Sequence, residues 1–132
     1  MTEGNTLSQL LQTLQDRADP KEQVRAAHAL GRLGDRDAVE PLITSLSDDN
    51  LYVRKAAVEA LAMLGDWKAV DPILERLTDS DLYVRQAAAS ALGELGEMRA
   101  EEFLEARLKS EPELIVRHAI KVALARLAGG DT

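Results

Sequence analysis

Apolar residues recur along the chain at helical spacing, and the pattern of apolar and polar positions itself repeats. The segment Leu51–Asp66 reads LYVRKAAVEALAMLGD, and 31 residues later Leu82–Glu97 reads LYVRQAAASALGELGE. Weaker versions stand at Asp19–Asp35 and at Leu114–Gly129. A period of this length made of helical units is typical of a solenoid, in which each unit buries its apolar face only against its neighbours.

The apolar stripes predict eight helices, arranged as half a repeat, three full repeats and another half repeat. We therefore expect an all-α fold of the α-α superhelix class, with antiparallel helices in two layers, as a single domain of residues 1–132. Its parts are an N-terminal half-repeat at 5–16, repeats at 19–48, 49–79 and 80–110, and a C-terminal half-repeat at 112–128.

Short polar residues and glycines mark the expected helix ends. Asn5 or Thr6 can cap the first helix. Asp19 caps the second helix, where Pro20 occupies the first helical position and needs no N–H. The glycines after the long helices should adopt the left-handed conformation that ends a helix. These glycines are Gly34, Gly65 and Gly96.

The second helix of each repeat carries its own signals. Pro41 and Pro72 occupy the same repeat position, so these helices should begin just before them, because proline inside a helix costs roughly 3 kcal/mol. The third repeat has Phe103 in that position and Glu101 where its sisters have valine. A glutamate is costly in a fully buried position, so we expect this repeat to pack differently.

The first full repeat leaves its register open. Aligned without a gap, Gln23 takes the position of Arg54, whereas the Val-Arg pair at 24–25 lies two residues late. We favour the gapless alignment because it places Pro20 on Leu51. Its helix should then bury an apolar stripe made of Ala26, Ala27, Ala29, Leu30 and Leu33.

The amino-acid composition supports the all-α prediction and limits the classes of partner that the protein could bind. Apolar residues make up 45% of the chain and aromatic residues 3%, and alanine and leucine are strong helix formers. The net charge of −7 argues against nucleic acid and anionic membranes, which are bound mainly through Lys and Arg. The absence of cysteine excludes disulfides and thiol chemistry. No signal peptide or membrane anchor is recognisable, so we expect a cytoplasmic protein.

The unit DNLYVRKAAVEALAMLGDWKAVDPILERLTD resembles the HEAT repeat, and in particular the short bilin-lyase-like repeats common in bacteria, archaea and cyanobacteria. The resemblance rests on the Val-Arg pairs, the alanine pairs after them, the Leu-Gly-Asp/Glu turns and Ala-Val-x-Pro in the second helix. It implies that second helices line a concave face where partners dock. It also implies that Arg54 and Arg85 bond to loop aspartate side chains of neighbouring units, for which Asp48 and Asp79 are the candidates.

The histidines test whether such repeats could hold a metal here. One HEAT-repeat enzyme family, the deoxyhypusine hydroxylases, binds two irons through His-Glu pairs on repeated helices. In this chain His28 is followed by Ala29 and His118 by Ala119, so neither pair is present. Because a metal site needs three or more converging ligands, we expect no metal, no cofactor and no catalytic site, and we place both histidines at the surface.

Positions that differ between repeats are the candidate binding site, because core positions keep their chemistry. Trp67, the one tryptophan, aligns with Arg36 and Met98. An exposed tryptophan is a natural hot spot for a protein partner, and the alternative is that it packs over the Gly65 turn or onto Val70. The candidate partner-binding residues are Arg36, Glu40, Thr44, Trp67, Lys68, Asp71, Glu75, Met98, Arg99 and Glu102.

These candidates are mixed in charge with an acidic surplus, which favours a partner with a basic or mixed face. The alternative for any one of them is a merely solvated helix face. Tyr52 and Tyr83 repeat identically, with Ile115 in the matching position, so we expect them to pack between repeats. Ile115 and Val122 make the last helix unusually apolar, which suggests a homodimer contact, binding of another chain, or tight packing on the third repeat.

The predicted function is that of a non-catalytic protein-protein interaction scaffold or adaptor, which binds its partner rigidly on the concave second-helix face. The alternative, from another class, is a bilin lyase-like enzyme subunit or a chaperone of chromophore proteins, because the resemblance allows a role in attaching or removing a tetrapyrrole. An engineered array is disfavoured, since irregularities such as the insertion near Pro112 would have been removed. We therefore expect a natural prokaryotic protein.

Overall fold

The structure is a computed structural model that describes residues 3–129. Every regular element in these residues is helical, as the apolar spacing predicts. Residue contacts divide the chain into two compact units, Met1–Ala69 and Val70–Thr132, and each unit is described by itself. The prediction of one domain over the whole chain therefore stays a prediction. Within residues 3–129 no helix is both long and apolar enough to cross a membrane.

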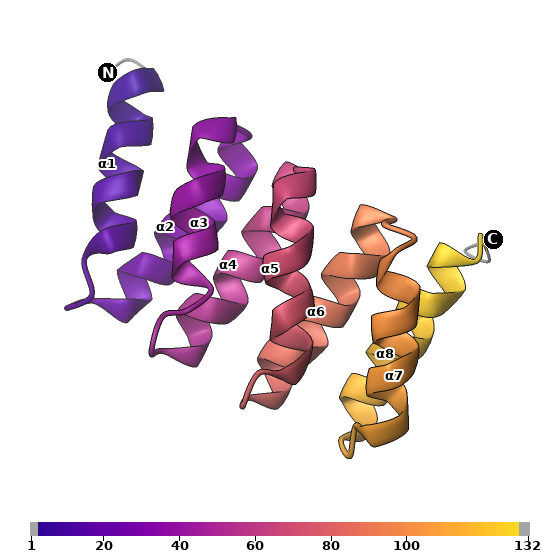
Figure 1. The fold of residues 1–132 in the computed structure, drawn as a ribbon. Coiled ribbons are helices and arrows are strands. Elements are labelled where there is room, and N and C mark those ends of the chain that lie inside the picture. The colour runs from indigo at the N-terminus through magenta and orange to yellow at the C-terminus, as the bar shows by residue number, and fades with distance from the viewer. Residues whose placement is uncertain (1–2, 130–132) are drawn as a thin grey trace. The chain divides into compact units, whose positions relative to one another are not determined.

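The first unit holds four α-helices and two short 3₁₀ segments in its described part. Helices α2 and α4 lie side by side, and α1 and α3 pack against them (Figure 1). The elements are α1 (Glu3–Gln15), α2 (Pro20–Leu33), η1 (Arg36–Ala38), α3 (Val39–Ser45), α4 (Leu51–Leu64) and η2 (Trp67–Ala69).

The second unit repeats this arrangement with its own helices. Helices α6 and α8 lie side by side, and α5 and α7 pack on the same side of them (Figure 1). The elements are α5 (Val70–Glu75), η3 (Arg76–Thr78), α6 (Leu82–Leu95), α7 (Ala100–Ser110) and α8 (Leu114–Leu127). Helices α3 and α5 begin two residues before their prolines, which confirms the predicted starts.

The helix ends confirm most of the predicted caps. The Asp19 side chain accepts a hydrogen bond from the backbone N–H of Glu22, and Pro20 is the first residue of α2. The three predicted glycines all have positive φ, at 76°, 67° and 67° in chain order, so a β-carbon at any of them would be strained. The predicted cap of the first helix is wrong, because α1 already begins at Glu3 and runs through residues 5 and 6.

The gapless register is confirmed, since α2, α4 and α6 begin at residues 20, 51 and 82. Gln23, in the position of Arg54, is only 2% exposed, and its Nε2 donates to the Leu14 carbonyl at 2.7 Å. The predicted stripe is partly wrong, because Leu33 is 37% exposed and Ala29 is half-buried. Leu33 is the last residue of α2, directly before the left-handed Gly34 that ends the helix.

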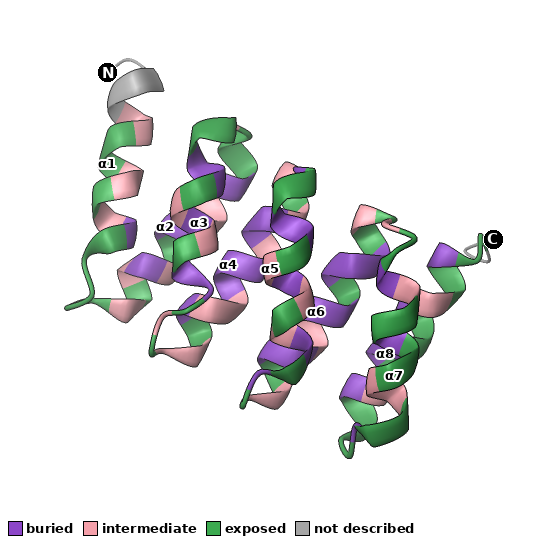
Figure 2. Cartoon of the chain, in the orientation of Figure 1, coloured by how far each residue is buried: buried purple, intermediate pink, exposed green. Residues whose placement is uncertain are grey.

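Each unit has a dry core of aliphatic side chains where its two helical layers meet (Figure 2). The third repeat departs from its sisters as predicted: Glu101 is half-buried where Val70 is 1% exposed, and Phe103 is 54% exposed. The largest fully buried hydrophobic side chains include Leu30, Leu42 and Leu61 in the first unit and Ile73, Leu92, Leu104 and Ile120 in the second.

Two glycines let the long helices of each unit approach closely. A β-carbon on Gly31 of α2 would come within 3.0 Å of the Ala60 Cα on α4. A β-carbon on Gly93 of α6 would come within 2.9 Å of the Ala123 Cα on α8. Real β-carbons do not approach backbone so closely, so glycine at this repeat position fixes the helix separation in both units.

Candidate functional site

All ten candidate binding residues are exposed, five in each unit. Trp67 is 71% exposed, and Met98 at the same repeat position is 56% exposed. The alternative that Trp67 packs over the neighbouring turn or onto Val70 is therefore wrong. Exposure meets the first requirement of a binding surface, and the binding role of these residues stays a proposal.

The turn before Trp67 is held by a buried carboxylate. Asp66 is 5% exposed, and it accepts hydrogen bonds from the Lys68 backbone N–H at 2.9 Å and from Nη1 of Arg36 at 3.0 Å. The Lys68 N–H has the largest influence and, with Arg36, holds the pKa of Asp66 below its ordinary value. The carboxylate is thus ionised at neutral pH. It fixes the backbone of the turn while the indole projects into solvent.

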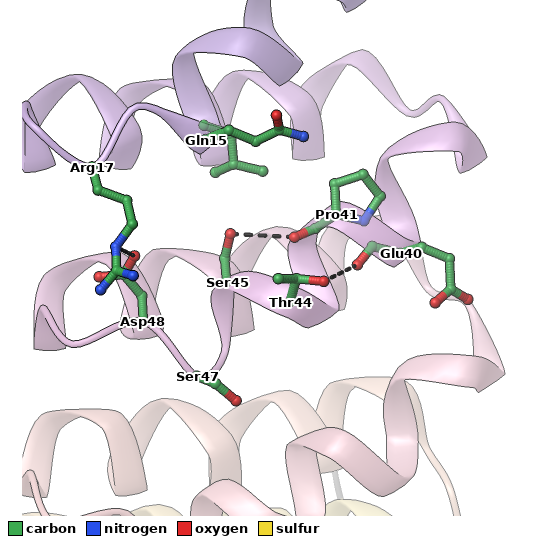
Figure 3. A pocket seen from close by; sticks show the side chains of 9 residues that line it. Gln15, Arg17, Glu40, Pro41, Thr44, Ser45, Ser47 and Asp48 are labelled. Carbon is green, nitrogen blue, oxygen red and sulfur yellow. Dashed lines mark hydrogen bonds and ion pairs between the residues drawn. The ribbon is translucent and has the colours of Figure 1, made fainter.

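The first unit also has a groove of about 550 Å³ between α1 and α3. Two candidate residues, Glu40 and Thr44, line it, and its floor includes the buried Leu14 and the ring of Pro41. The remaining lining residues are Gln15, Arg17, Ser45, Ser47 and Asp48. Both hydroxyls on α3 are already used, since Thr44 donates to the Glu40 carbonyl and Ser45 to that of Pro41 (Figure 3).

The two ends of this groove differ in the charged side chains that they carry. Figure 3 shows Arg17 beside Asp48 at one end and Glu40 at the other. Arg17 lies 2.7 Å from the Asp49 carboxylate and 3.9 Å from that of Asp48, so its charge is largely compensated. The groove therefore offers an apolar floor and a net acidic rim. Such a surface suits a partner segment with apolar and basic side chains.

This groove is not among the features predicted from the sequence, although the sequence carries a signal for it. Leu7, Leu10, Leu11 and Leu14 match the apolar pattern of α3 after 32 residues, so α1 and α3 are both second helices of neighbouring repeats. That match predicts that they lie side by side. It does not predict a hollow between them, because the width of the gap depends on side chains such as Pro41 and Ser45 that contribute little bulk.

In the second unit two candidate residues neutralise each other. Nη1 of Arg99 lies 2.9 Å from the Asp71 carboxylate, across exposed parts of α5 and the turn before α7. Glu75 on α5 and Glu102 on α7 are also exposed. The acidic surplus predicted for this surface is thus retained, and Met98 and Phe103 add exposed apolar area to it.

The repeated arginines bind the loops that the resemblance implied, but the bonds to Asp48 and Asp79 run to backbone carbonyls, whereas the resemblance implied the side chains. Nη1 of Arg54 donates to the backbone carbonyl of Asp48 at 2.9 Å, and Nη1 of Arg85 donates likewise to Asp79. The two aspartate side chains also accept the backbone N–H two residues further on. These arginines therefore close the loops before α4 and α6, which is a structural role.

A second buried charge cluster was not predicted. Glu111 is 2% exposed and accepts two hydrogen bonds from Arg85, at 2.8 and 3.1 Å, and one from Nε of Arg107 at 3.1 Å. Burial alone would raise the pKa of Glu111, but the hydrogen bonds from Arg85, the Glu113 backbone and Arg107 hold the pKa below its ordinary value. The cluster is fully occupied by its own partners, so we assign it to stability.

The two histidines differ from each other. His118 is exposed, as predicted, whereas His28 is partly buried and its Nε2 lies 2.9 Å from Oε1 of Glu59, exactly one repeat away. Glu59 also pairs with Lys55 at 3.0 Å. Within residues 3–129 no group of three or more His, Asp or Glu side chains could hold a metal ion.

Two further predictions concern exposed aromatic and aliphatic side chains. The packing role predicted for Tyr52 and Tyr83 is wrong, because they are 64% and 49% exposed in the first turns of α4 and α6. Both tyrosines directly follow the first residue of their helix, and their side chains remain largely in contact with solvent. Ile115 and Val122 on α8 are 41% and 42% exposed, so tight packing on the third repeat does not cover them.

Comparison with known proteins identifies the repeats. A family model described as HEAT repeats matches residues 7–71 and 52–125. Among curated proteins, phycocyanobilin lyase subunit alpha of Pseudanabaena tenuis (strain PCC 7409) is 51% identical over 36% of this chain and 20% of its own length. The present chain therefore matches about a fifth of that relative.

Two solved structures share the fold. The complex of CpcE and CpcF of phycocyanin lyase from Nostoc sp. PCC7120 matches with a TM-score of 0.81 and 28% identity, over 96% of this chain and 54% of that one. Human deoxyhypusine hydroxylase in complex with glycerol matches with a TM-score of 0.80 and 25% identity, over 97% and 47%. This chain spans about half the length of both. The predicted α-α superhelix class is thereby confirmed.

Proposed function

The chain belongs to the HEAT-repeat family, with relatives of the bilin-lyase-like kind, and on this premise we propose that it is a protein-binding subunit of a lyase-type complex. The observation that carries the proposal is the likeness to phycocyanin lyase, found both in sequence and in structure. In that solved structure the similar chain is one of two proteins in a complex. The alternative function considered from the sequence is thus better supported than a general scaffold.

The contribution of this chain would be to bind and position another protein. Its candidate residues project from short helices whose turns are fixed by buried caps such as Asp66, so binding orders little backbone. Trp67 would supply the largest buried area, and the groove between α1 and α3 of the same unit would accept a partner segment. We assign no catalytic residue to this chain.

The proposal is tested by binding to defined partners. Isothermal titration of this protein with purified CpcE and CpcF of the Nostoc lyase, each used separately, should give a saturable complex with one of them. Trp67→Ala should weaken that complex by roughly 10-fold or more, the usual effect of a hot-spot residue. Tyr52→Ala removes an equally exposed aromatic side chain from the same unit and should leave the affinity unchanged.

A second candidate function, binding of the chromophore itself, is favoured by the groove. Its volume of about 550 Å³ lies within the range of small-molecule sites, and its floor is largely apolar. Free phycocyanobilin mixed with the protein should then show a shifted visible absorbance, and Thr44→Trp, which fills the groove, should abolish the shift. If the chain binds a lyase subunit but the absorbance of phycocyanobilin does not change, the chain binds protein and not the chromophore.

A further inference from the structure

The outward face of α8 is a second, distinct surface with both apolar and basic character. Seven residues of this helix are exposed, and at helical spacing they form one face opposite the residues buried against the rest of the unit. Leu114 is 80% exposed, the highest value among the large apolar side chains described. The seven residues of this α8 face are Leu114, Ile115, His118, Lys121, Val122, Ala125 and Arg126.

The repeat register shows what kind of structure such a face accepts. His28 and Gly31 of α2 contact Glu59 and Ala60 of α4, and Gly93 of α6 approaches Ala123 of α8. After allowance for the one-residue insertion, the same repeat positions in α8 are residues 122 and 125. The α8 face is therefore the face with which α2 and α6 each receive a neighbouring helix.

The positive charge of α8 indicates which kind of partner helix could bind to it. It carries Arg117, Lys121 and Arg126 and no acidic residue, in a chain whose net charge is −7. Arg117 is used within the unit, because its Nη1 donates to the Leu108 carbonyl at 2.7 Å. Lys121 and Arg126 make no ion pair within residues 3–129, so both charges are available to a partner.

We propose that the α8 face docks an acidic amphipathic helix of another protein, which lies along the same face that α2 presents to α4, but at a wider separation because α8 has Ala125 where α2 and α6 have glycine. Apolar side chains of the partner would cover Leu114, Ile115 and Val122, and its carboxylates would face Lys121 and Arg126. This surface does not include any of the ten candidate residues on the second helices. Its test is therefore independent of the proposed lyase-type function.

The charge pattern also argues against a second copy of this chain as the occupant. Two α8 helices would bring only basic residues together. A head-to-tail contact, in which α8 of one copy meets α2 of another, would also bring like charges together. Helix α2 carries three basic residues and one acidic residue. The predicted homodimer through Ile115 and Val122 is thus disfavoured, and it becomes one outcome of the test.

A charge-reversed copy of the chain supplies a defined acidic helical probe. Lys121→Glu with Arg126→Glu keeps the apolar residues of the α8 face and makes the helix acidic. In sedimentation equilibrium, wild type alone should be monomeric, whereas an equimolar mixture with this variant should form a 1:1 complex. Raising NaCl from about 50 to about 500 mM should weaken the complex roughly 10-fold, because the contacts are charged and near the surface.

A matched control changes the same number of charges elsewhere. Lys68→Glu with Lys109→Glu reverses two exposed lysines outside the α8 face and should form no complex with wild type. Far-UV circular dichroism establishes that both variants are folded. The proposal is overturned if the mixture stays monomeric at about 100 μM with both proteins folded, if the control associates equally well, or if wild type alone dimerises and Val122→Arg abolishes that dimer.

Discussion

The two helix pairs α2/α4 and α6/α8 share one backbone plan and differ in their electrostatics. Each pair is brought together by a glycine at the same repeat position. In α2 of the first unit the position of the repeated arginine holds Gln23, which makes a single neutral hydrogen bond, and the contacts of Glu59 with His28 and Lys55 are partly solvated. In the second unit Arg85 and Glu111 form a buried ion pair. The repeat thus dictates helix separation and leaves the polar contacts free to vary.

The largest expected effect is the loss of the buried pair in the second unit. Glu111→Gln removes the charge that compensates Arg85, whose side chain is only 10% exposed. Breaking a buried pair by removing one partner typically costs about 3–5 kcal/mol of unfolding free energy. Urea unfolding should show this loss, whereas Glu59→Gln in the first unit should cost about 1 kcal/mol or less, because that pair is partly solvated. Equal losses would contradict the comparison.

The next effect concerns the glycines that the two pairs share. Gly93→Ala should cost about 1–3 kcal/mol, because its β-carbon would meet the backbone of Ala123 at 2.9 Å. Gly31→Ala should cost less, since its nearest contact is the sulfur of Met63, a flexible and half-exposed side chain that can move. Thermal unfolding of the two variants measures the difference. Stabilisation by Gly93→Ala would show that the helices can separate freely.

Acidification is expected to lower the folding stability by a smaller amount. The pKa of Glu111 is lower in the folded protein than its ordinary value of about 4.5, so its contribution to stability is present above that pH and is lost as the pH falls through the folded pKa. The pKa of Glu59 is also lowered, since His28 and Lys55 outweigh the effect of burial, but its carboxylate is 37% exposed and contributes less. Urea midpoints measured from pH 7 to pH 3 should therefore fall mainly below pH 4.5.

The variant Glu111→Gln sharpens this pH prediction. It should show a flatter pH dependence than wild type, while Glu59→Gln should follow wild type closely. If the two variants respond alike, the buried pair is not the main source of acid sensitivity.

The fold could be predicted because its signals are local. Helix lengths follow from apolar spacing, helix ends from Asp19 and the left-handed glycines, and the gapless register from Pro20. The errors arose where local signals compete with neighbours. Leu33 fits the stripe of α2 and Tyr52 repeats identically between units, yet both side chains are exposed.

The candidate site could be predicted only as a set of exposed positions. Variation between repeats identified Trp67 and Met98 correctly as surface residues. The groove beside α3, the pair of Arg99 with Asp71 and the buried Glu111 depend on distances between helices, which a repeat pattern does not contain. Partner identity is further removed, because it depends on the chemistry of a second molecule.

The most direct test measures the affinity of this chain for the lyase subunit that we propose as its partner, before and after removal of the variable exposed residues. In isothermal titration, the triple variant Arg36→Ala, Trp67→Ala and Met98→Ala should lose binding at least 10-fold while keeping the urea midpoint of wild type. The double variant Tyr52→Ala and Tyr83→Ala should keep both the affinity and the urea midpoint of wild type. Unchanged affinity of the triple variant, or a loss of its folding, would contradict the proposal that these residues contact the partner.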